Sequence, residues 1–182
     1  INKKNIHKGF FEMNVVTLKY KKIDGSWTNN IKRELFGGAQ VSAVLPYDPI
    51  KKEIVLIQQF RPGTISKNFN NFLYEIVAGI IDKGESPETT AKRECIEETG
   101  CKIKSILPIQ GYFPAPGSSE SYYHLFLGEV EAFEGSRTMG LENENEDILV
   151  KCYNFNKVKE MLQNKEIVNG ITLIALQWFF LN

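Results

Sequence analysis

The pattern of hydrophobic and polar positions predicts several strands and a few helices. Apolar residues are nearly continuous at 41–46 and 54–60, on either side of the turn signal Tyr47-Asp48-Pro49. Such runs are typical of strands that are buried on both faces. Further strands are predicted at 72–78, 103–111, 121–130 and 148–155, and helices at 87–99, 156–164 and 171–181. Strands mixed with a few helices predict an α/β fold in which a mixed sheet lies between helical layers.

Residues 9–36 have a separate pattern. Two β-prone runs lie on either side of Asp24-Gly25, which is a β-hairpin signal. An isolated hairpin is only marginally stable, so this one must pack on its own domain or on a second subunit. We therefore predict an N-terminal antiparallel hairpin and dimerisation segment at 1–36 and a main domain at 37–182.

Composition narrows the class of protein. With 182 residues, 42% of them hydrophobic, the chain can bury one sizeable core. Lysine plus arginine and aspartate plus glutamate each number 22, so the charge gives no reason to expect a nucleic acid or a membrane as partner. Three cysteines without paired spacing, no apolar run of membrane-spanning length and no signal-peptide core predict a cytoplasmic protein.

The stretch 79–101, GIIDKGESPETTAKRECIEETGC, carries the candidate chemistry. Ser86 suits a helix N-cap, Pro87 the first helical position and Gly100 the C-terminal stop. On a helical wheel of about 100° per residue, Glu94, Glu97 and Glu98 share one narrow face, and Ala91, Cys95, Ile96 and Thr99 cover the other side. The sequence therefore predicts a helix with three clustered carboxylates.

Two interpretations of this acidic face are open. Like charges at Glu94 and Glu98 cost a helix about 0.2–0.5 kcal/mol, which a divalent cation would offset. Carboxylate oxygens without a nearby histidine or thiolate suit Mg²⁺ or Mn²⁺ and not zinc. The alternative is a solvated acidic face that is bridged to Lys92 and Lys102. The particular spacing of the residues favours the metal site.

That spacing, G-x5-E-x7-R-E-x2-E-E-x-G, resembles the signature of the Nudix hydrolases. The seven matching positions are Gly79, Glu85, Arg93, Glu94, Glu97, Glu98 and Gly100. Cys95 and Cys101 stand where the family prefers aliphatic residues, and a buried cysteine packs as a small hydrophobic residue. The resemblance implies the Nudix α/β/α sandwich and a loop-helix-loop that binds divalent metals.

Later segments resemble one branch of this family, the ADP-ribose pyrophosphatases. They are GYFPAPGSSES, with Pro116 lying 16 residues after Gly100, then LGEVEAFEG, MGLENENEDI and the tail IALQWF. The resemblance implies Mg²⁺-dependent hydrolysis of ADP-ribose to AMP and ribose 5-phosphate. Hydrolysis of a GDP-sugar such as GDP-mannose is the alternative. A non-catalytic nucleotide-binding domain is disfavoured because every glutamate of the signature is present.

The resemblance also implies roles for individual residues. Two or three Mg²⁺ ions, or Mn²⁺, would be bound by the carbonyl of Ala78 and by Glu94, Glu98 and Glu146, with Glu97 in support. Glu144 would be the general base, and Arg93 would pair with a glutamate such as Glu85. Substrate contacts would come from Phe10, Phe11, Arg33, Glu34, Arg61, Ile80, Ala115, Pro116, Gly117 and Glu120.

The resemblance further implies a homodimer with exchanged N-terminal segments. In it the partner subunit would supply Arg33 and Glu34, and Phe10 and Phe11 would hold the adenine. Gly38 stands where some relatives have an arginine, so one substrate contact is expected to be missing.

Overall fold

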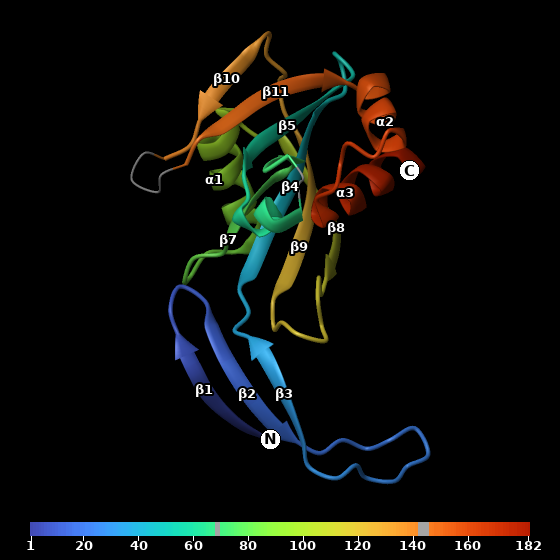
Figure 1. Cartoon of the computed structure of the whole chain (residues 1–182). Coiled ribbons are helices and arrows are strands. Elements are labelled where there is room, and N and C mark those ends of the chain that lie inside the picture. Colours follow the sequence, from blue (N-terminus) through green and yellow to red (C-terminus); the bar gives the residue numbers. More distant parts are fainter. Residues whose placement is uncertain (68–69, 142–145) are drawn as a thin grey trace. The chain divides into compact units, whose positions relative to one another are not determined.

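The computed structural model describes residues 1–67, 70–141 and 146–182. The chain forms two compact units (Figure 1). Unit 1 consists of residues 1–40 and 112–123, and unit 2 consists of residues 41–111 and 124–182. The segment 112–123 therefore belongs to the same unit as the N-terminal strands, although it is distant from them in sequence.

An eight-stranded mixed sheet lies largely in unit 2. Its strands are β4 (Gln40–Asp48), β5 (Glu53–Phe60), β6 (Phe72–Glu75), β7 (Val77–Ile80), β8 (Ser105–Tyr112), β9 (Tyr122–Glu129), β10 (Ser136–Met139) and β11 (Ile148–Asn154). The order is β10-β11-β5-β4-β9-β8, with β6 beside β5 and β7 beside β4. The backbone N–H of Tyr122 donates to the carbonyl of Ala39, and that of Val130 donates to the carbonyl of Tyr47. The residue numbers rise together, by eight in each segment, so β4 and β9 run parallel.

Helices cover both faces of this sheet. They are α1 (Pro87–Thr99), α2 (Phe155–Gln163) and α3 (Gly170–Leu181). Val55 and Ile57 of β5 pack in one buried cluster with Ala91 and Cys95 of α1. Ile54 and Leu56, equally buried, point to the opposite face because side chains alternate along a strand. Figure 1 shows α1 on one side of the sheet and α2 and α3 on the other, which confirms the predicted α/β/α sandwich.

The segment predicted as one strand at 72–78 is two strands. β6 pairs with β5, whereas β7 pairs with β4. Ile76 lies between them, and its backbone N–H donates to Thr172 Oγ1 of α3 over 3.0 Å. Apart from Glu75 the run 72–78 is apolar and contains no glycine or proline, so the sequence alone predicts a single strand.

Unit 1 contains a three-stranded antiparallel sheet, β1-β2-β3. β2 (Glu12–Leu18) pairs with β3 (Ile31–Phe36), and Gly25 between them has a φ of 85°, so the hairpin predicted around Asp24-Gly25 is confirmed. β1 (Asn2–Lys8) was not predicted, because its sequence NKKNIHK is almost entirely polar and every residue is exposed. β1 is a strand because its backbone pairs with that of β2, and not because its side chains enter a core.

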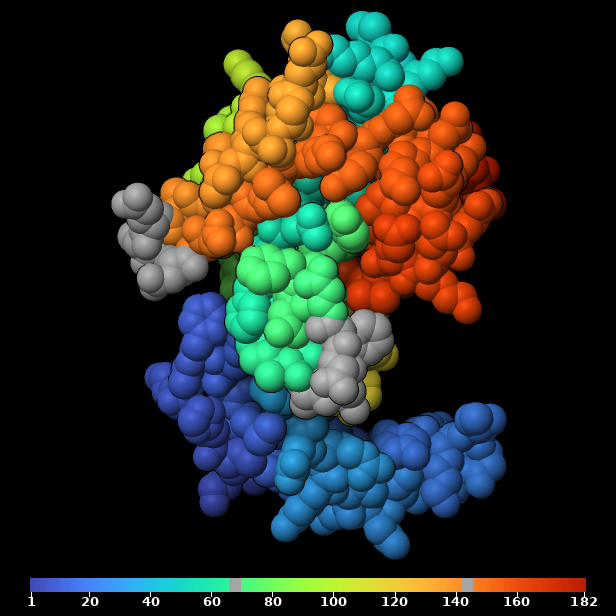
Figure 2. Space-filling model, turned by 45° about the horizontal axis from the view of Figure 1, so that its top comes forward, coloured from blue at the N-terminus to red at the C-terminus, as the bar shows by residue number. Residues whose placement is uncertain are grey.

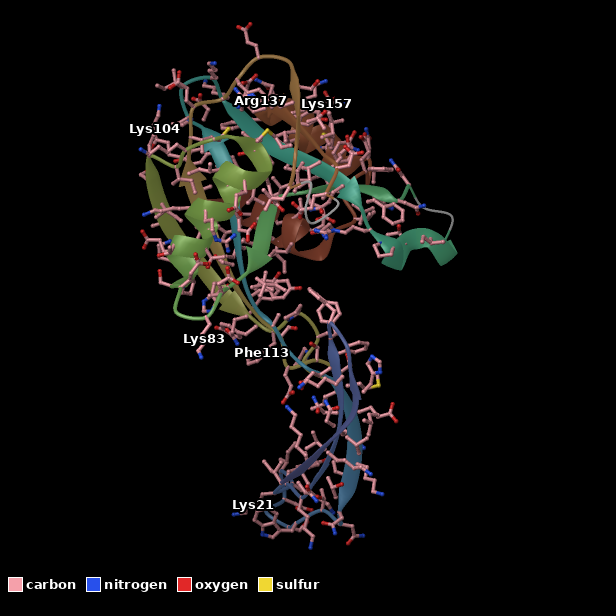
Figure 3. The ribbon with its side chains drawn as sticks, turned by 90° about the vertical axis from the view of Figure 1, so that its left-hand side faces the viewer. Lys21, Lys83, Lys104, Phe113, Arg137 and Lys157 are labelled. Carbon is pink, nitrogen blue, oxygen red and sulfur yellow. The ribbon has the colours of Figure 1, made fainter. Side chains whose placement is uncertain are left out.

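The segment 112–123 is joined to β3. The backbone N–H of Phe36 donates to the Ser118 carbonyl over 2.8 Å, and that of Glu120 donates to the Phe36 carbonyl. Phe113, labelled in Figure 3, packs edge-to-face against Tyr122 with ring centroids 4.8 Å apart. The loop that contains Pro116 is thus bonded to β3 on its C-terminal side.

Two short elements escape prediction. η1 (Pro62–Lys67) is a single short 3₁₀ helix, and β10 is a four-residue strand paired with β11 at the surface of unit 2 (Figure 2, orange). Both are too short to show a hydrophobic period. No helix in the described part of the chain is long and apolar enough to cross a membrane.

Candidate active site

Helix α1 is fixed at both ends by its own sequence. Its bounds are those predicted, and Ser86 Oγ accepts a hydrogen bond from the N–H of Thr89. Gly100 has a φ of 70°, and its N–H donates to the carbonyl of Ile96. Only glycine adopts this left-handed conformation without strain, so the helix ends where the signature requires.

The buried side of α1 differs from the wheel in one respect. Ala91, Cys95 and Thr99 are fully buried as expected, but Ile96 is 48% exposed and Glu98 is only 4% exposed. The helix therefore packs on the sheet along an arc that includes Glu98. The glutamate face is not solvated on all sides; one of its carboxylates is enclosed.

Strand β7 approaches α1 closely at Gly79. A Cβ atom at this position would lie 1.8 Å from Oε1 of Glu94 and 2.0 Å from its carboxyl carbon. The neighbouring Ala78 donates its N–H to Glu98 Oε2 over 3.3 Å. Glycine at 79 thus leaves the space that the Glu94 carboxylate occupies, and β7 places a backbone dipole beside Glu98.

Three carboxylates in this region act on one another electrostatically. Burial, with the nearby charges of Glu94 and Glu146, raises the pKa of Glu98 well above its usual value. Burial also raises the pKa of Glu94, against the opposing effect of Arg93. Glu146, whose Oε2 accepts from the N–H of Leu141 over 3.3 Å, is close enough to contribute to both shifts. Glu94, Glu98 and Glu146 therefore lie within electrostatic reach of one another.

Arg93 is the cation at the centre of the signature. Its guanidinium donates to Glu85 over 3.2 and 3.1 Å, and Nη1 donates to Glu94 and Glu97, each over 2.8 Å. The predicted pairing with Glu85 is confirmed. These bonds, that to Glu85 above all, raise the pKa of Arg93 and keep it charged. Arg93 joins the loop before α1 to the acidic face of the helix.

The donor atoms suit a hard divalent cation. They are carboxylate oxygens of Glu94, Glu98 and Glu146. Burial, with repulsion from neighbouring carboxylates, raises the pKa of Glu94 and of Glu98, and a bound dication would favour the charged forms of both. Among residues 1–67, 70–141 and 146–182, no three His, Cys, Asp or Glu side chains are gathered closely enough to bind an ion as they stand. Arg93 occupies oxygens of Glu94 and Glu97 instead. Glu144, the predicted base, lies outside the described residues.

Arg61 belongs to the same region of unit 2. It follows β5, and its Nε and Nη2 donate to the carboxylate of Glu75 on β6 over 2.6 to 3.1 Å. Burial disfavours its charge, but Glu75 outweighs this and raises the pKa of Arg61, with smaller contributions from Glu98 and Glu146. Sequence reasoning found Arg61 but missed Glu75, a charged residue within an otherwise apolar run, which was the available signal.

The other predicted contact residues lie in unit 1, apart from Ile80 at the end of β7. Phe10 is 85% exposed and packs edge-to-face with Phe11 at 4.8 Å. Arg33 is exposed on β3, next to Glu34. Ala115 accepts two backbone hydrogen bonds that form the turn at Pro116 and Gly117, and Glu120 pairs with Lys3 Nζ at 2.6 Å. Unit 1 thus holds Phe10, Phe11, Arg33, Glu34 and the Pro116 loop.

The absence of a side chain at Gly38 has a structural reason. A Cβ here would lie 2.1 Å from the carbonyl carbon of Glu120 and 2.4 Å from the nitrogen of Ser121. The backbone of the 112–123 segment occupies the space, so an arginine at 38 would require that segment to move.

Comparison with known proteins identifies the family. A NUDIX domain model matches residues 38–171, which include the whole of the signature. The chain belongs to the Nudix family. Relatives named ADP-ribose pyrophosphatase extend the match over the full chain, and together with the family model they make it a Nudix pyrophosphohydrolase.

Three of these relatives are informative. The ADP-ribose pyrophosphatase of Escherichia coli (strain K12) is 33% identical over 182 residues, which are 100% of this chain and 87% of the relative. The ADP-ribose pyrophosphatase of Haemophilus influenzae is 33% identical over 185 residues, covering 100% and 85%. The GDP-mannose pyrophosphatase of Salmonella arizonae is 30% identical over 183 residues, covering 100% and 94%.

A solved structure supports the fold. The crystal structure of an ADP compounds hydrolase superposes with a TM-score of 0.70 and covers 99% of this chain and 90% of the other. At 17% sequence identity this likeness concerns the fold alone.

Proposed function

We propose that this Nudix protein hydrolyses the pyrophosphate bond of ADP-ribose to AMP and ribose 5-phosphate with Mg²⁺. The observation that carries the proposal is the 33% identity to two ADP-ribose pyrophosphatases over the whole chain, including the segments outside the signature. Those outer segments hold the candidate base and sugar contacts, so similarity there bears on the substrate and not only on the bond that is cut.

The chain's own residues have separable tasks in this proposal. The cations would neutralise the charge of the pyrophosphate. Their ligands would be Glu94, Glu98, Glu146 and the carbonyl of Ala78. Arg93 holds Glu94 and Glu97 against the loop at Glu85. Arg61 would bind a phosphate oxygen with its planar fork. Glu144 would take the proton of the attacking water, a role whose loss typically costs about 10²–10⁴-fold in rate.

The test is release of AMP from ADP-ribose by the purified protein with Mg²⁺ and with EDTA. Glu98→Gln is expected to lower kcat by about 100-fold or more, because a neutral amide binds a hard cation weakly. Glu88→Gln is the matched control, since Glu88 lies on the same helix and forms an exposed ion pair with Lys92. No AMP from the wild-type protein, or equal rates for the wild type and Glu98→Gln, would refute the proposal.

GDP-mannose hydrolysis is the second candidate. It is supported by the 30% identity to a GDP-mannose pyrophosphatase over the full chain. The two substrates share the pyrophosphate and differ in the base and the sugar. A panel of ADP-ribose, GDP-mannose and related nucleotide sugars separates them by kcat/KM. A non-catalytic binding protein would give calorimetric binding of ADP-ribose with Mg²⁺ and no product from any of them.

We also propose a homodimer in which Arg33 and Glu34 serve the active site of the partner subunit. Support comes from the exposed apolar side chains of unit 1, among them Ile6, Phe10 and Trp27, which a subunit interface would cover. Light scattering gives the answer: a dimer has twice the 20.8 kDa mass of the chain.

A further inference from the structure

Glu75 has a carboxylate whose burial needs an explanation. Its side chain is 3% exposed, and it lies on β6 opposite Ile57 of β5. Removing a carboxylate from water costs several kcal/mol, and a buried ion pair is seldom more stable than an apolar pair of the same volume. Stability is therefore a poor reason for a glutamate at this position.

The geometry of the pair fixes the direction of one guanidinium. Nε of Arg61 lies 3.0 and 3.1 Å from the two oxygens of Glu75, and Nη2 lies 2.6 Å from Oε2. These bonds engage one edge of the planar fork. Among the described residues Nη1 donates to no acceptor, and this corner of the guanidinium is the one that Glu75 does not hold.

The backbone of Arg61 is held as firmly as its side chain. Its N–H donates to the Asn71 carbonyl over 2.8 Å, and its own carbonyl accepts from the N–H and the Oγ1 of Thr64. Thr64 Oγ1 also contacts Asn71 Oδ1 at 2.9 Å. Both ends of a long, otherwise mobile side chain are thus fixed, which lowers the entropy lost when Arg61 binds.

Arg61 also lies within electrostatic reach of two candidate metal ligands. Its side chain is 42% exposed, and the charges of Glu98 and Glu146 contribute to the rise in its pKa. The buried carboxylate of Glu75 holds the guanidinium of Arg61, which is partly exposed and near these glutamates. Arg61 is therefore placed to bind an anion at this site.

We propose that Glu75 is a positioning residue that aims Arg61 at the pyrophosphate of the substrate. The inference rests on the proposed pyrophosphate hydrolysis and adds to it a residue outside the signature. Glu75 touches no substrate atom and acts only through Arg61.

A double-mutant cycle tests this dependence. Glu75→Gln keeps the size of the side chain and loses its charge, so the fork is no longer held, and kcat/KM for ADP-ribose is expected to fall about 10- to 100-fold. Arg61→Lys is expected to cost at least as much. The double variant is expected to be no worse than Arg61→Lys alone, because Glu75 then has no fork to position.

Two controls separate positioning from folding. Asp48→Asn replaces another buried carboxylate, which accepts hydrogen bonds from three backbone N–H groups of unit 2, and is expected to leave kcat/KM unchanged. Glu75→Asp retains the charge at shorter reach and is expected to recover part of the lost rate; it also replaces Glu75→Gln if that variant does not fold. Losses that multiply in the double variant, or a Glu75→Gln enzyme with wild-type kcat/KM, overturn the proposal.

A measurement without turnover keeps this proposal distinct from the proposed function. The Nε–H resonance of Arg61, assigned by its disappearance in Arg61→Lys, is expected to be protected from solvent exchange in the wild type and unprotected in Glu75→Gln. If the wild type cleaves no nucleotide sugar, the proposed function fails, and this resonance still decides whether Glu75 fixes Arg61. Equal exchange in both proteins overturns the positioning role.

Discussion

At the scale of single residues, Gly79 decides where the carboxylate of Glu94 can lie. The missing Cβ leaves the position that Oε1 of Glu94 occupies. Because the obstructing atoms are the far end of a flexible side chain, a larger residue would displace the carboxylate and leave the backbone in place. The first glycine of the signature, Gly79, is explained by the close approach of β7 to the side chain of Glu94 and not by a special backbone angle.

Gly79→Ala is therefore expected to separate activity from stability. Displacement of the Glu94 carboxylate by 1–2 Å is expected to lower kcat/KM by about 100-fold, since misplacement of that size is costly in catalysis. The melting temperature should change little. Gly170→Ala is the control, because a Cβ at the start of α3 meets nothing within 4 Å. An active Gly79→Ala enzyme would remove the steric argument.

The carboxylate of Asp48 stabilises the turn between β4 and β5 by accepting backbone hydrogen bonds. Its Oδ1 accepts from the N–H groups of Ile50 and Lys51, and Oδ2 accepts from that of Ala132, all within 2.9 Å. Burial alone would raise its pKa, but the three N–H donors and the charge of Lys51 outweigh it, so the pKa of Asp48 lies below its ordinary value of 3.8.

Asp48→Asn is expected to lower the free energy of unfolding by about 2 kcal/mol at pH 7, because a buried N–H loses its acceptor. A lowered folded-state pKa means that the stabilisation is present above the unfolded-state pKa and disappears as pH falls through the folded-state value. Urea unfolding at pH 7 and near pH 3 should therefore show a difference from wild type that shrinks in acid. Glu134→Gln, at an exposed site, should show none at either pH.

At the scale of elements, α1 combines local and long-range determinants. Its two ends follow from Ser86 and Gly100, which act on the backbone within a few residues. Its orientation follows from the contact of Ala91 and Cys95 with Val55 and Ile57 in the core. The ends of α1 can be predicted from residues next to them in the sequence. Its orientation depends on a strand that lies about 40 residues away in the sequence.

Ser86→Ala is expected to destabilise the protein by about 1 kcal/mol, the usual cost of losing an N-cap acceptor. Urea denaturation with EDTA present measures this without the contribution of a bound cation. Ser136→Ala, at an exposed position of β10, is the comparison and should stay within about 0.5 kcal/mol of wild type. An equal loss in both variants would mean that Ser86 does not act as a cap.

At the scale of the whole molecule, the candidate residues are divided between the two units. Glu94, Glu98, Glu146 and Arg61 lie in unit 2, and Phe10, Arg33 and the Pro116 loop lie in unit 1. If subunits exchange N-terminal segments, the Arg33 that serves one active site belongs to the other chain. Two inactive variants can then complement each other.

Mixing Arg33→Ala with Glu98→Gln tests this arrangement. After the subunits are exchanged at equal concentrations, half of the dimers contain one chain of each kind, and each of these has one intact site. About a quarter of wild-type kcat is expected, far above the mean of the separate variants. Activity no greater than that mean, or a monomer by light scattering, would refute the shared site.

The sequence determined what short-range rules can encode. The seven positions of the signature, the caps of α1 and the hairpin at Asp24-Gly25 were predicted because each depends on side chains within a few residues of the backbone they shape. The family followed from the same spacing.

Tertiary structure decided the rest. Pairing with β2 makes the polar segment β1 a strand, and a change of partner divides 72–78 between β6 and β7. Packing against the sheet exposes Ile96 and encloses Glu98, which a wheel drawn from α1 alone cannot distinguish. Glu75 meets Arg61 because β6 lies beside β5, so their pairing depends on a contact between strands and has no local signal.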